Sequence, residues 1–168
     1  MKLSLCMIVK DEQDVLEIAL SSVKGFADEI IIVDTGSNDN TKKIARKFTN
    51  KIYDFKWIDD FSAARNFSLS KATGNWILVL DADEVIDPEN LKKSSFDPNM
   101  DAILLLQRDY TKNKNSFRFS YLKERDKFTK DYEGYVPYPI IRLFKNRKEI
   151  FYQAESMKPW VTVYLTPD

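Results

Sequence analysis

The stretch "GNWILVLDADEVID" at residues 74–87 guides the interpretation of the whole sequence. Its apolar run, 76–80, is typical of a buried strand, and Asp81, Asp83 and Glu84 follow it directly. Carboxylates this close repel one another, so the cluster requires a metal ion, a basic side chain or open solvent. Taken alone, the pattern also fits a solvated turn in which an aspartate caps the next helix.

The first half of the chain alternates strand and helix patterns around this stretch. Continuous apolar runs such as "LSLCMIV" suit a parallel sheet that is covered on both faces. Strands are expected at 3–9, 29–34, 51–57 and 76–83. Helices are expected at 11–26, 41–48 and 59–74, with Gly25 and Gly74 as C-caps and an aspartate starting the last helix. This order predicts an α/β fold with a mostly parallel sheet flanked by helices.

The second half follows a different pattern. Strands are expected at 101–110, at 140–146 and in the final segment 158–168. The polar, aromatic segment 108–139 has no helical period, so we expect it to be irregular and functional. The length predicts a single domain, 1–168, with a donor half at 1–100 and an acceptor half at 101–168. The abrupt end suggests that the acceptor half is truncated.

Composition excludes several classes of function. The charges balance at 26 basic and 26 acidic residues, which gives no support for a nucleic-acid partner. The apolar runs are too short to span a membrane and the start is too charged for a secretory signal, so we expect a cytoplasmic protein. Cys6 is expected to be an inert core thiol. Because the chain has no histidine, any metal must be held by oxygen ligands, which favours Mg²⁺ or Mn²⁺.

Acidic residues follow the expected strands at one edge of the predicted sheet. Asp11 and Glu12 follow the first strand, Asp34 ends the second, and Asp81 and Asp83 close the strand that begins at residue 76. In open α/β sheets, ligands bind beyond the carboxyl ends of the strands. A divalent cation with a ligand carrying phosphates and hydroxyls would therefore make this acidic edge favourable.

The letters "LVLDADEV" also match the phosphatases of the haloacid dehalogenase class. In that class the motif sits on the first strand of the sheet and its first aspartate attacks phosphorus. Here three expected strands precede the motif, and no paired acidic motif follows at a later strand end. The sequence therefore disfavours this alternative.

Four blocks, in order, carry a family resemblance: "LSLCMIVKDE", "DEIIIVDTGSNDNT", "DDFSAARNFSLSKATGNWILVLDADE" and "IIRLFKN". Together they resemble the donor-binding part of a family-2 glycosyltransferase, the inverting type with a GT-A, Rossmann-like fold. The resemblance implies metal-dependent transfer from a nucleotide-diphosphate sugar, with UDP favoured, to a saccharide, lipid-linked or protein acceptor.

The resemblance also implies donor-binding residues. The Val9 backbone and Glu12 would border the nucleoside, Asp34 would bind the base or ribose, and Arg65 would contact the base or diphosphate. Asp34 also fits a plain turn cap, and Arg65 also fits a surface ion pair with Asp59 or Asp60.

For the metal, the resemblance implies that Asp83 binds Mn²⁺ or Mg²⁺ bridging the diphosphate. Asp81 would lie beside it, near the ribose and the sugar, as a metal-binding and catalytic residue. Asn66 either serves the site or ties its helix to a neighbouring loop. The aromatic residues of the second half either line an acceptor groove or pack an irregular loop: Tyr132, Tyr135 and Tyr138.

The resemblance fails at the general base. Relatives with this last block often continue to a His-Glu pair, where this chain has Met157–Lys158. Other carboxylates are candidates for the base: Glu155, Asp109, Asp131 and Glu133. The chain is therefore expected to be an active transferase with an unassigned base, a nucleotide-sugar-binding module with degraded catalysis, or a piece of a larger enzyme.

Overall fold

The structure is a computed structural model that describes residues 1–87, 91, 99–125, 129–154 and 161–165. The chain divides into two compact units, residues 1–102 with 142–168, and residues 103–141. We describe each unit by itself. The expected division into a donor half and an acceptor half concerns function and stays a prediction.

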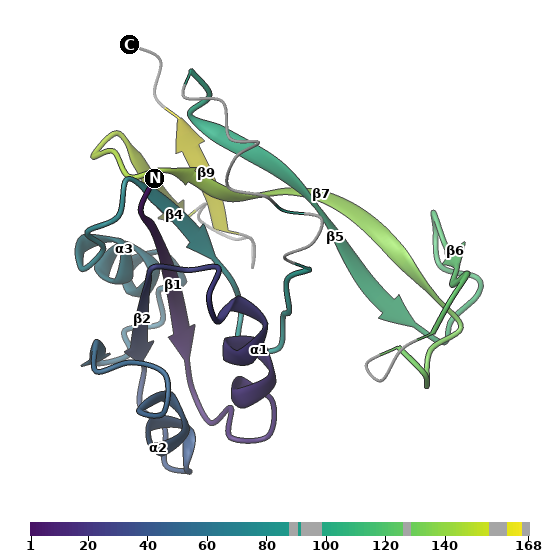
Figure 1. Cartoon of the computed structure of the whole chain (residues 1–168), viewed down its shortest axis with the longest axis horizontal. Coiled ribbons are helices and arrows are strands. Elements are labelled where there is room, and N and C mark those ends of the chain that lie inside the picture. The colour runs from purple at the N-terminus through teal and green to yellow at the C-terminus, as the bar shows by residue number, and fades with distance from the viewer. Residues whose placement is uncertain (88–90, 92–98, 126–128, 155–160, 166–168) are drawn as a thin grey trace. The chain divides into compact units, whose positions relative to one another are not determined.

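The first unit is built on a parallel sheet (Figure 1). Its strands and helices, in chain order, are β1 (Leu3–Val9), α1 (Leu16–Val23), β2 (Glu29–Asp34), α2 (Thr41–Ala45), β3 (Ile52–Asp54), α3 (Phe61–Ser70) and β4 (Trp76–Val79). The strands lie in the order β3-β2-β1-β4 and all pair in parallel. The end of β7 (Gly134–Lys145) then pairs antiparallel with β4. The expected α/β class with a mostly parallel sheet is confirmed.

The strand order creates a switch point between β1 and β4. The chain moves outward from β1 to β2 and β3, and then returns past β1 to form β4. Because such crossovers are right-handed, this reversal places α1 and α2 on one face of the sheet and α3 on the other. Consistently, α1 packs beside α2, whereas α3 packs on β1, β2 and β8 (Ile150–Ala154). Ligands of open α/β sheets bind at such a point.

The end of the chain forms a small second sheet. Strand β8 pairs antiparallel with β9 (Val161–Leu165), which confirms the strand expected in the final segment. The strand β8 itself was not predicted.

None of the helices among the described residues has the length and apolar character of a membrane span.

Helix boundaries follow the local signals in part. The carboxylate of Asp60 accepts hydrogen bonds from the backbone N–H groups of Ser62 and Ala63, at 2.8 and 3.1 Å, so the expected aspartate cap of α3 is confirmed. Gly25 lies just beyond α1 with a φ of +80°. The prediction that Gly74 caps α3 is wrong, because α3 ends at Ser70. Gly74 instead lies so close to β1 that a Cβ atom would come 2.6 Å from the Ser4 Oγ.

The expected start of the first helix at residue 11 is also wrong. Residues 11–13 bond to the loop after β2, although the Glu12 carbonyl also accepts the backbone N–H groups of Val15 and Leu16. The backbone N–H of Asp11 donates to Ser37, that of Glu12 to Thr41, and the Asp11 carboxylate accepts from the Asn38 N–H. Asp11 has a φ of +55°, which is outside the right-handed helical region, so a helix cannot start at this residue, and α1 begins only at Leu16.

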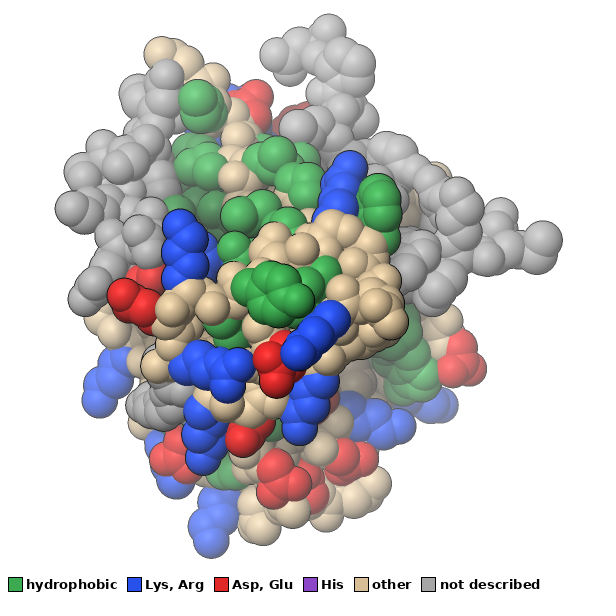
Figure 2. Space-filling model, turned by 90° about the vertical axis from the view of Figure 1, so that its right-hand side faces the viewer, with side chains coloured by type: hydrophobic (Ala, Val, Ile, Leu, Met, Phe, Trp, Pro, Cys, Tyr) green, Lys and Arg blue, Asp and Glu red, His purple; other side chains and the backbone are tan. Residues whose placement is uncertain are grey.

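The second unit is more regular than the sequence suggests. Strand β5 (Ala102–Thr111) runs past residue 108, β6 (Ser120–Tyr121) follows, and β7 begins at Gly134, so the expectation of an irregular segment at 108–139 is wrong in part. Pro137 and Pro139 conceal β7 in the sequence because proline cannot donate to a sheet ladder. Because the two prolines are two residues apart, the N–H groups that they lack would both point to the same side of the strand. The hydrogen bonds on the other side of the strand are therefore unaffected. Figure 2 is viewed from the right-hand side of Figure 1, where β6 is labelled.

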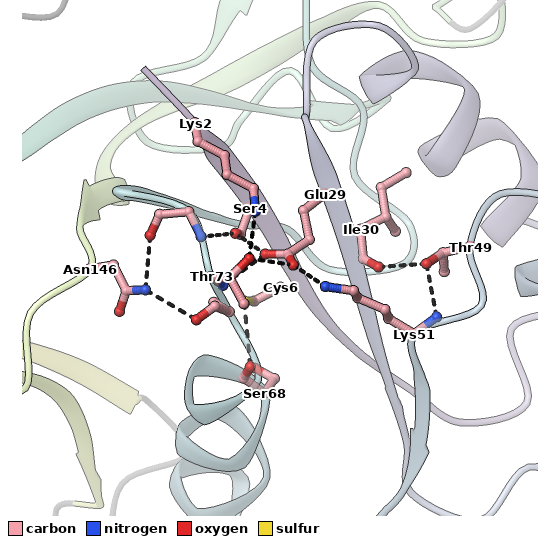
Figure 3. Close-up of polar contacts among 12 residues, drawn as sticks. Lys2, Ser4, Cys6, Glu29, Ile30, Thr49, Lys51, Ser68, Thr73 and Asn146 are labelled. Carbon is pink, nitrogen blue, oxygen red and sulfur yellow. Dashed lines mark hydrogen bonds and ion pairs between the residues drawn. The ribbon is translucent and has the colours of Figure 1, made fainter.

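A buried polar network closes the amino end of the first unit's sheet (Figure 3). The Glu29 carboxylate accepts hydrogen bonds from Ser4 and Lys51, and from the backbone N–H and hydroxyl of Thr73, both at 2.8 Å. Burial would raise the pKa of Glu29, but the hydrogen bonds from Lys51, Ser4 and Thr73 outweigh it and lower the pKa to about 2. Nearby Cys6 is fully buried, and burial raises its thiol pKa to about 12, as expected of an inert core thiol.

We expect Glu29→Gln to lower the free energy of unfolding at pH 7 by about 2 kcal/mol, because the amide cannot accept all of these bonds or pair with Lys51. The pKa of Glu29 is lower in the folded than in the unfolded chain, so its stabilisation is present above the unfolded pKa and is lost as the pH falls toward about 2. Urea denaturation at neutral and acidic pH measures both effects.

The matched control is Glu17→Gln, which removes an exposed ion pair with Lys47 and should change stability far less. A wild-type protein and a Glu29→Gln variant of equal stability at pH 7 would contradict the assigned role of this network.

Candidate functional site

The candidate site lies where β1, β2 and β4 end. Val9 and Asp34 close their strands side by side, since their Cα atoms are partners in the β1–β2 register. Asp81 and Asp83 follow β4, on the other side of β1. The structure therefore brings the expected acidic residues to one edge of the sheet, at the switch point.

Asp34 is fully buried, and its two carboxylate oxygens differ. Oδ1 accepts hydrogen bonds from the backbone N–H groups of Gly36 and Ser37, each at 2.9 Å, and lies 3.6 Å from the Lys42 Nζ. Oδ2 is buried and has no hydrogen-bond donor among the described residues. Asp34 is thus the turn cap that the sequence allowed, but capping uses only one of its oxygens.

Two arginines share the carboxylate of Asp81. Arg65, on α3, donates to Oδ1 at 2.5 Å, and Arg142, on β7, donates to Oδ2 at 2.9 Å. Both arginine side chains are only 12% exposed. The alternative that Arg65 pairs with Asp59 or Asp60 on the surface is therefore wrong.

Arg142 also binds Glu84, at 2.5 Å from its Oε1. The other Glu84 oxygen accepts the backbone N–H of Asp81 at 2.9 Å, which folds the turn after β4 back on itself. Sequence analysis assigned no role to Arg142, although a basic residue within the apolar block "IIRLFKN" signals a buried cation that requires an acidic partner. Basic side chains therefore hold two of the three carboxylates after β4.

The shared arginines set the protonation of this turn. Burial alone would raise the pKa of Asp81, but the charges of Arg65 and Arg142 outweigh it and lower the pKa. For Glu84 burial dominates, and the pKa is raised in spite of Arg142. Asp81 is therefore held firmly as an anion.

Asp83 and Glu12 form the open, acidic part of the site. Asp83 is exposed, and Glu12 is half-buried. Burial raises the pKa of Glu12, and the nearby charges of Asp83, Asp39, Asp11 and Asp81 raise it further. Within the described residues, no group of three or more acidic or cysteine side chains forms a complete metal site. The oxygens present would fit a cation only if a ligand supplied the rest of its coordination shell.

Asn66 has a structural role. Its side-chain amide donates to the Tyr152 carbonyl at 2.7 Å and accepts the Tyr152 N–H at 2.8 Å, so it ties α3 to β8 as a strand partner would. The Tyr152 ring lies 5.4 Å from the Arg65 guanidinium, and burial raises the pKa of its phenol to about 12. The alternative in which Asn66 secures its helix is confirmed, with a strand as its partner.

A hollow of about 280 Å³ lies next to this site, between α2 and β3, lined by Lys42, Arg46, Asn50, Ile52 and Asp54. Lys42 connects the two, because its Nζ lies 2.5 Å from the Asp54 carboxylate as well as near Asp34. The carboxylates after β4 do not line this hollow.

The candidate general bases have different positions in the chain. Glu155 lies outside the described residues. Asp109, Asp131 and Glu133 belong to the second unit, where Glu133 pairs with Lys114 and Arg125. In the same unit Tyr132 and Tyr135 pack on Tyr110, and Tyr138 is exposed.

Comparison with known proteins identifies relatives over most of the chain. The sequence profile of the family "Glycosyl transferase family 2" matches residues 4–156. A TPR repeat-containing protein of Synechococcus elongatus is 40% identical over 155 residues, which is 90% of this chain and 34% of that protein. An uncharacterized glycosyltransferase of Mycoplasma genitalium is 29% identical over 169 residues, or 90% of this chain and 51% of that protein.

Among solved structures, one is similar to part of this chain. The crystal structure of S. aureus TarS, residues 1–349, has a TM-score of 0.49 and 26% identity, and covers 56% of this chain and 31% of that one. This chain spans about a third of the length of the Synechococcus elongatus relative and about half of the length of the Mycoplasma genitalium relative. The family match confirms the resemblance drawn from the four sequence blocks.

We expect Arg142→Met to lower the free energy of unfolding by about 2–4 kcal/mol, because it leaves the half-buried Glu84 without its cation and Asp81 with only Arg65. In the double variant Arg142→Met/Glu84→Gln part of this loss should be recovered. Urea denaturation of the four proteins of this cycle gives the coupling energy.

Arg147→Met is the matched control, since Arg147 is half-exposed and pairs with Asp101 at the surface. Additive effects of the Arg142 and Glu84 changes would show that the two side chains are not coupled.

Proposed function

Since this chain belongs to glycosyl transferase family 2, we propose that it transfers a sugar from a nucleotide-diphosphate donor to a saccharide, lipid-linked or protein acceptor, with inversion. Family membership and the parallel β3-β2-β1-β4 order confirm the GT-A class of fold. The observation that carries the proposal is the buried Asp34 Oδ2 at the end of β2, which has no donor among the described residues.

A buried acceptor without a partner costs about 1–3 kcal/mol, so a ligand N–H that reaches Asp34 Oδ2 would be favoured. Only one oxygen is free, because Oδ1 already accepts two backbone N–H groups. Uracil presents a single ring N–H donor between two carbonyls, whereas guanine presents two adjacent donors that suit a carboxylate with both oxygens free. This asymmetry supports a uridine nucleotide over a guanosine nucleotide.

The arginine pair and the acidic residues have different roles around the diphosphate. The charges of Arg65 and Arg142 are balanced by Asp81 and Glu84, so this group brings no net positive charge to a diphosphate. Both Asp81 oxygens are engaged, which leaves Asp83 as the better ligand for a metal ion. In this proposal Asp81 orients the two arginines, and Asp83, with Glu12 nearby, holds Mn²⁺ or Mg²⁺ together with phosphate oxygens. When bound, the ion would neutralise charge on the leaving nucleotide.

The acceptor hydroxyl must lose its proton to a carboxylate as it attacks the sugar from the side opposite the diphosphate. Glu155 stays the predicted base, with Asp109, Asp131 and Glu133 as alternatives. The cytoplasmic location, the UDP preference and the identity of the acceptor also stay predictions.

We expect calorimetric titration to show that UDP binds more tightly than GDP and that Mn²⁺ strengthens UDP binding. Asp83→Ala should abolish the Mn²⁺-dependent gain. Asp34→Asn should weaken UDP at least about tenfold, because its side-chain amide keeps one acceptor for the turn but turns an N–H toward the uracil N–H.

Asp14→Ala is the control, since Asp14 is an exposed carboxylate outside this cluster. A folded sample that binds neither nucleotide would refute the donor site. Binding without turnover of any nucleotide sugar would instead favour a nucleotide-sugar-binding module, and turnover that survives Glu155→Gln would eliminate Glu155 as the base.

A further inference from the structure

A strongly basic segment lies at the β6 end of the second unit. Between residues 112 and 125 it has a single acidic residue, Glu124. We call this segment the basic tip, and its cationic residues are Lys112, Lys114, Arg118, Lys123 and Arg125. The chain as a whole is neutral, so the positive charge is local to this segment.

Not all of this charge is neutralised within the unit. Glu133 pairs with Lys114 at 3.6 Å and with Arg125 at 3.4 Å. Lys112, Arg118 and Lys123 are exposed and have no ion-pair partner in the part of the chain that the structure describes. These three cations are therefore available to an external anionic partner.

The basic tip also exposes aromatic side chains. Phe117 is 82% exposed and Tyr121 is 66% exposed, although rings of this size are normally buried. The Arg118 guanidinium lies 5.4 Å from the centre of the Phe117 ring, and the rings of Tyr121 and Phe119 form a T-shaped pair with their centres 5.0 Å apart. Figure 2 shows hydrophobic side chains exposed on this face, with basic side chains beside them and acidic side chains among these.

Basic side chains and exposed aromatic side chains are the two components of peripheral membrane attachment. Lysine and arginine are attracted to anionic headgroups, and aromatic side chains enter the boundary between headgroups and acyl chains. We propose that the basic tip binds the surface of an anionic lipid bilayer. Phe117 and Tyr121 enter the interface, and Lys112, Arg118 and Lys123 contact lipid phosphates.

A lipid surface explains the tip better than a single nucleic-acid strand does. Strand-binding proteins hold the backbone in a charged groove and stack successive bases on open aromatic faces. Here Arg118 lies over one face of Phe117, so this face is not open for a base to stack on. An exposed ring flanked by cations needs only an apolar layer to enter, which a bilayer offers. This inference is independent of sugar transfer, because it concerns attachment alone.

Co-sedimentation of the full chain with vesicles tests the proposal directly. We expect binding to vesicles that contain about a quarter phosphatidylglycerol in phosphatidylcholine, little binding to phosphatidylcholine alone, and loss of binding as salt rises. The triple variant Lys112→Ser/Arg118→Ser/Lys123→Ser should weaken binding at least about tenfold at low salt. Phe117→Ser/Tyr121→Ser should weaken it while the salt dependence is retained.

The matched control removes three exposed lysines of the first unit, Lys24→Ser/Lys43→Ser/Lys56→Ser, and should bind vesicles as the unchanged protein does. Circular dichroism confirms that each variant is folded. Equal binding to neutral and anionic vesicles, no binding to either, or an equal loss in the control variant would each overturn the proposal. So would tight binding of a single-stranded oligonucleotide without any vesicle binding. These outcomes concern vesicle binding alone. Nucleotide titration of the same variants tests the donor site separately.

Discussion

The sharing of one carboxylate by two arginines holds the candidate site together. Asp81 lies just after β4, while Arg65 comes from α3 and Arg142 from β7, which are 16 and 61 residues away along the chain. Neither guanidinium could be buried to this extent without an anion, and Glu84 supplies a second one for Arg142. The turn after β4 is therefore fixed from both sides before any ligand arrives. Of the three carboxylates that follow this buried strand, Asp81 and Glu84 hold the arginines, and Asp83 stays open.

The strand order explains why this arrangement lies where a ligand could use it. Because β4 returns to the far side of β1, the loops after β1, β2 and β4 meet at the switch point, with α3 on the opposite face from α1 and α2. The Glu29 network lies at the other end of the same strands. Residues that stabilise the sheet are thus largely separate from those that would contact a nucleotide, apart from the arginine group, which does both.

The features that could be predicted from the sequence are those that depend on local sequence patterns and on where the strands end. The parallel strands, the Asp60 cap and the placing of Asp34 and Asp81 at one edge follow from apolar runs and from the general geometry of α/β sheets. The missed features are contacts between distant parts of the chain. Asn66 binds the backbone of Tyr152, 86 residues away, and residues 11 and 12, ahead of α1, bond to side chains that follow β2. Pro137 and Pro139 concealed a strand whose pairing on one side needs no N–H from either residue. Such features depend on which segments become neighbours, and a single sequence does not specify this.

The contacts between the loop at 11–13 and the loop at 36–41 have a further consequence. Side chains of each loop bond to the backbone of the other: Ser37 and Thr41 accept from the first loop, and Asp11 and Gln13 accept from the second. These mutual hydrogen bonds restrict the conformations of both loops beside Asp34. Little conformational entropy therefore remains to be lost when a ligand binds against either loop. Each of these bonds joins a side chain of one loop to a backbone N–H of the other, so the loss of one of these side chains would leave a backbone donor of the facing loop without this acceptor.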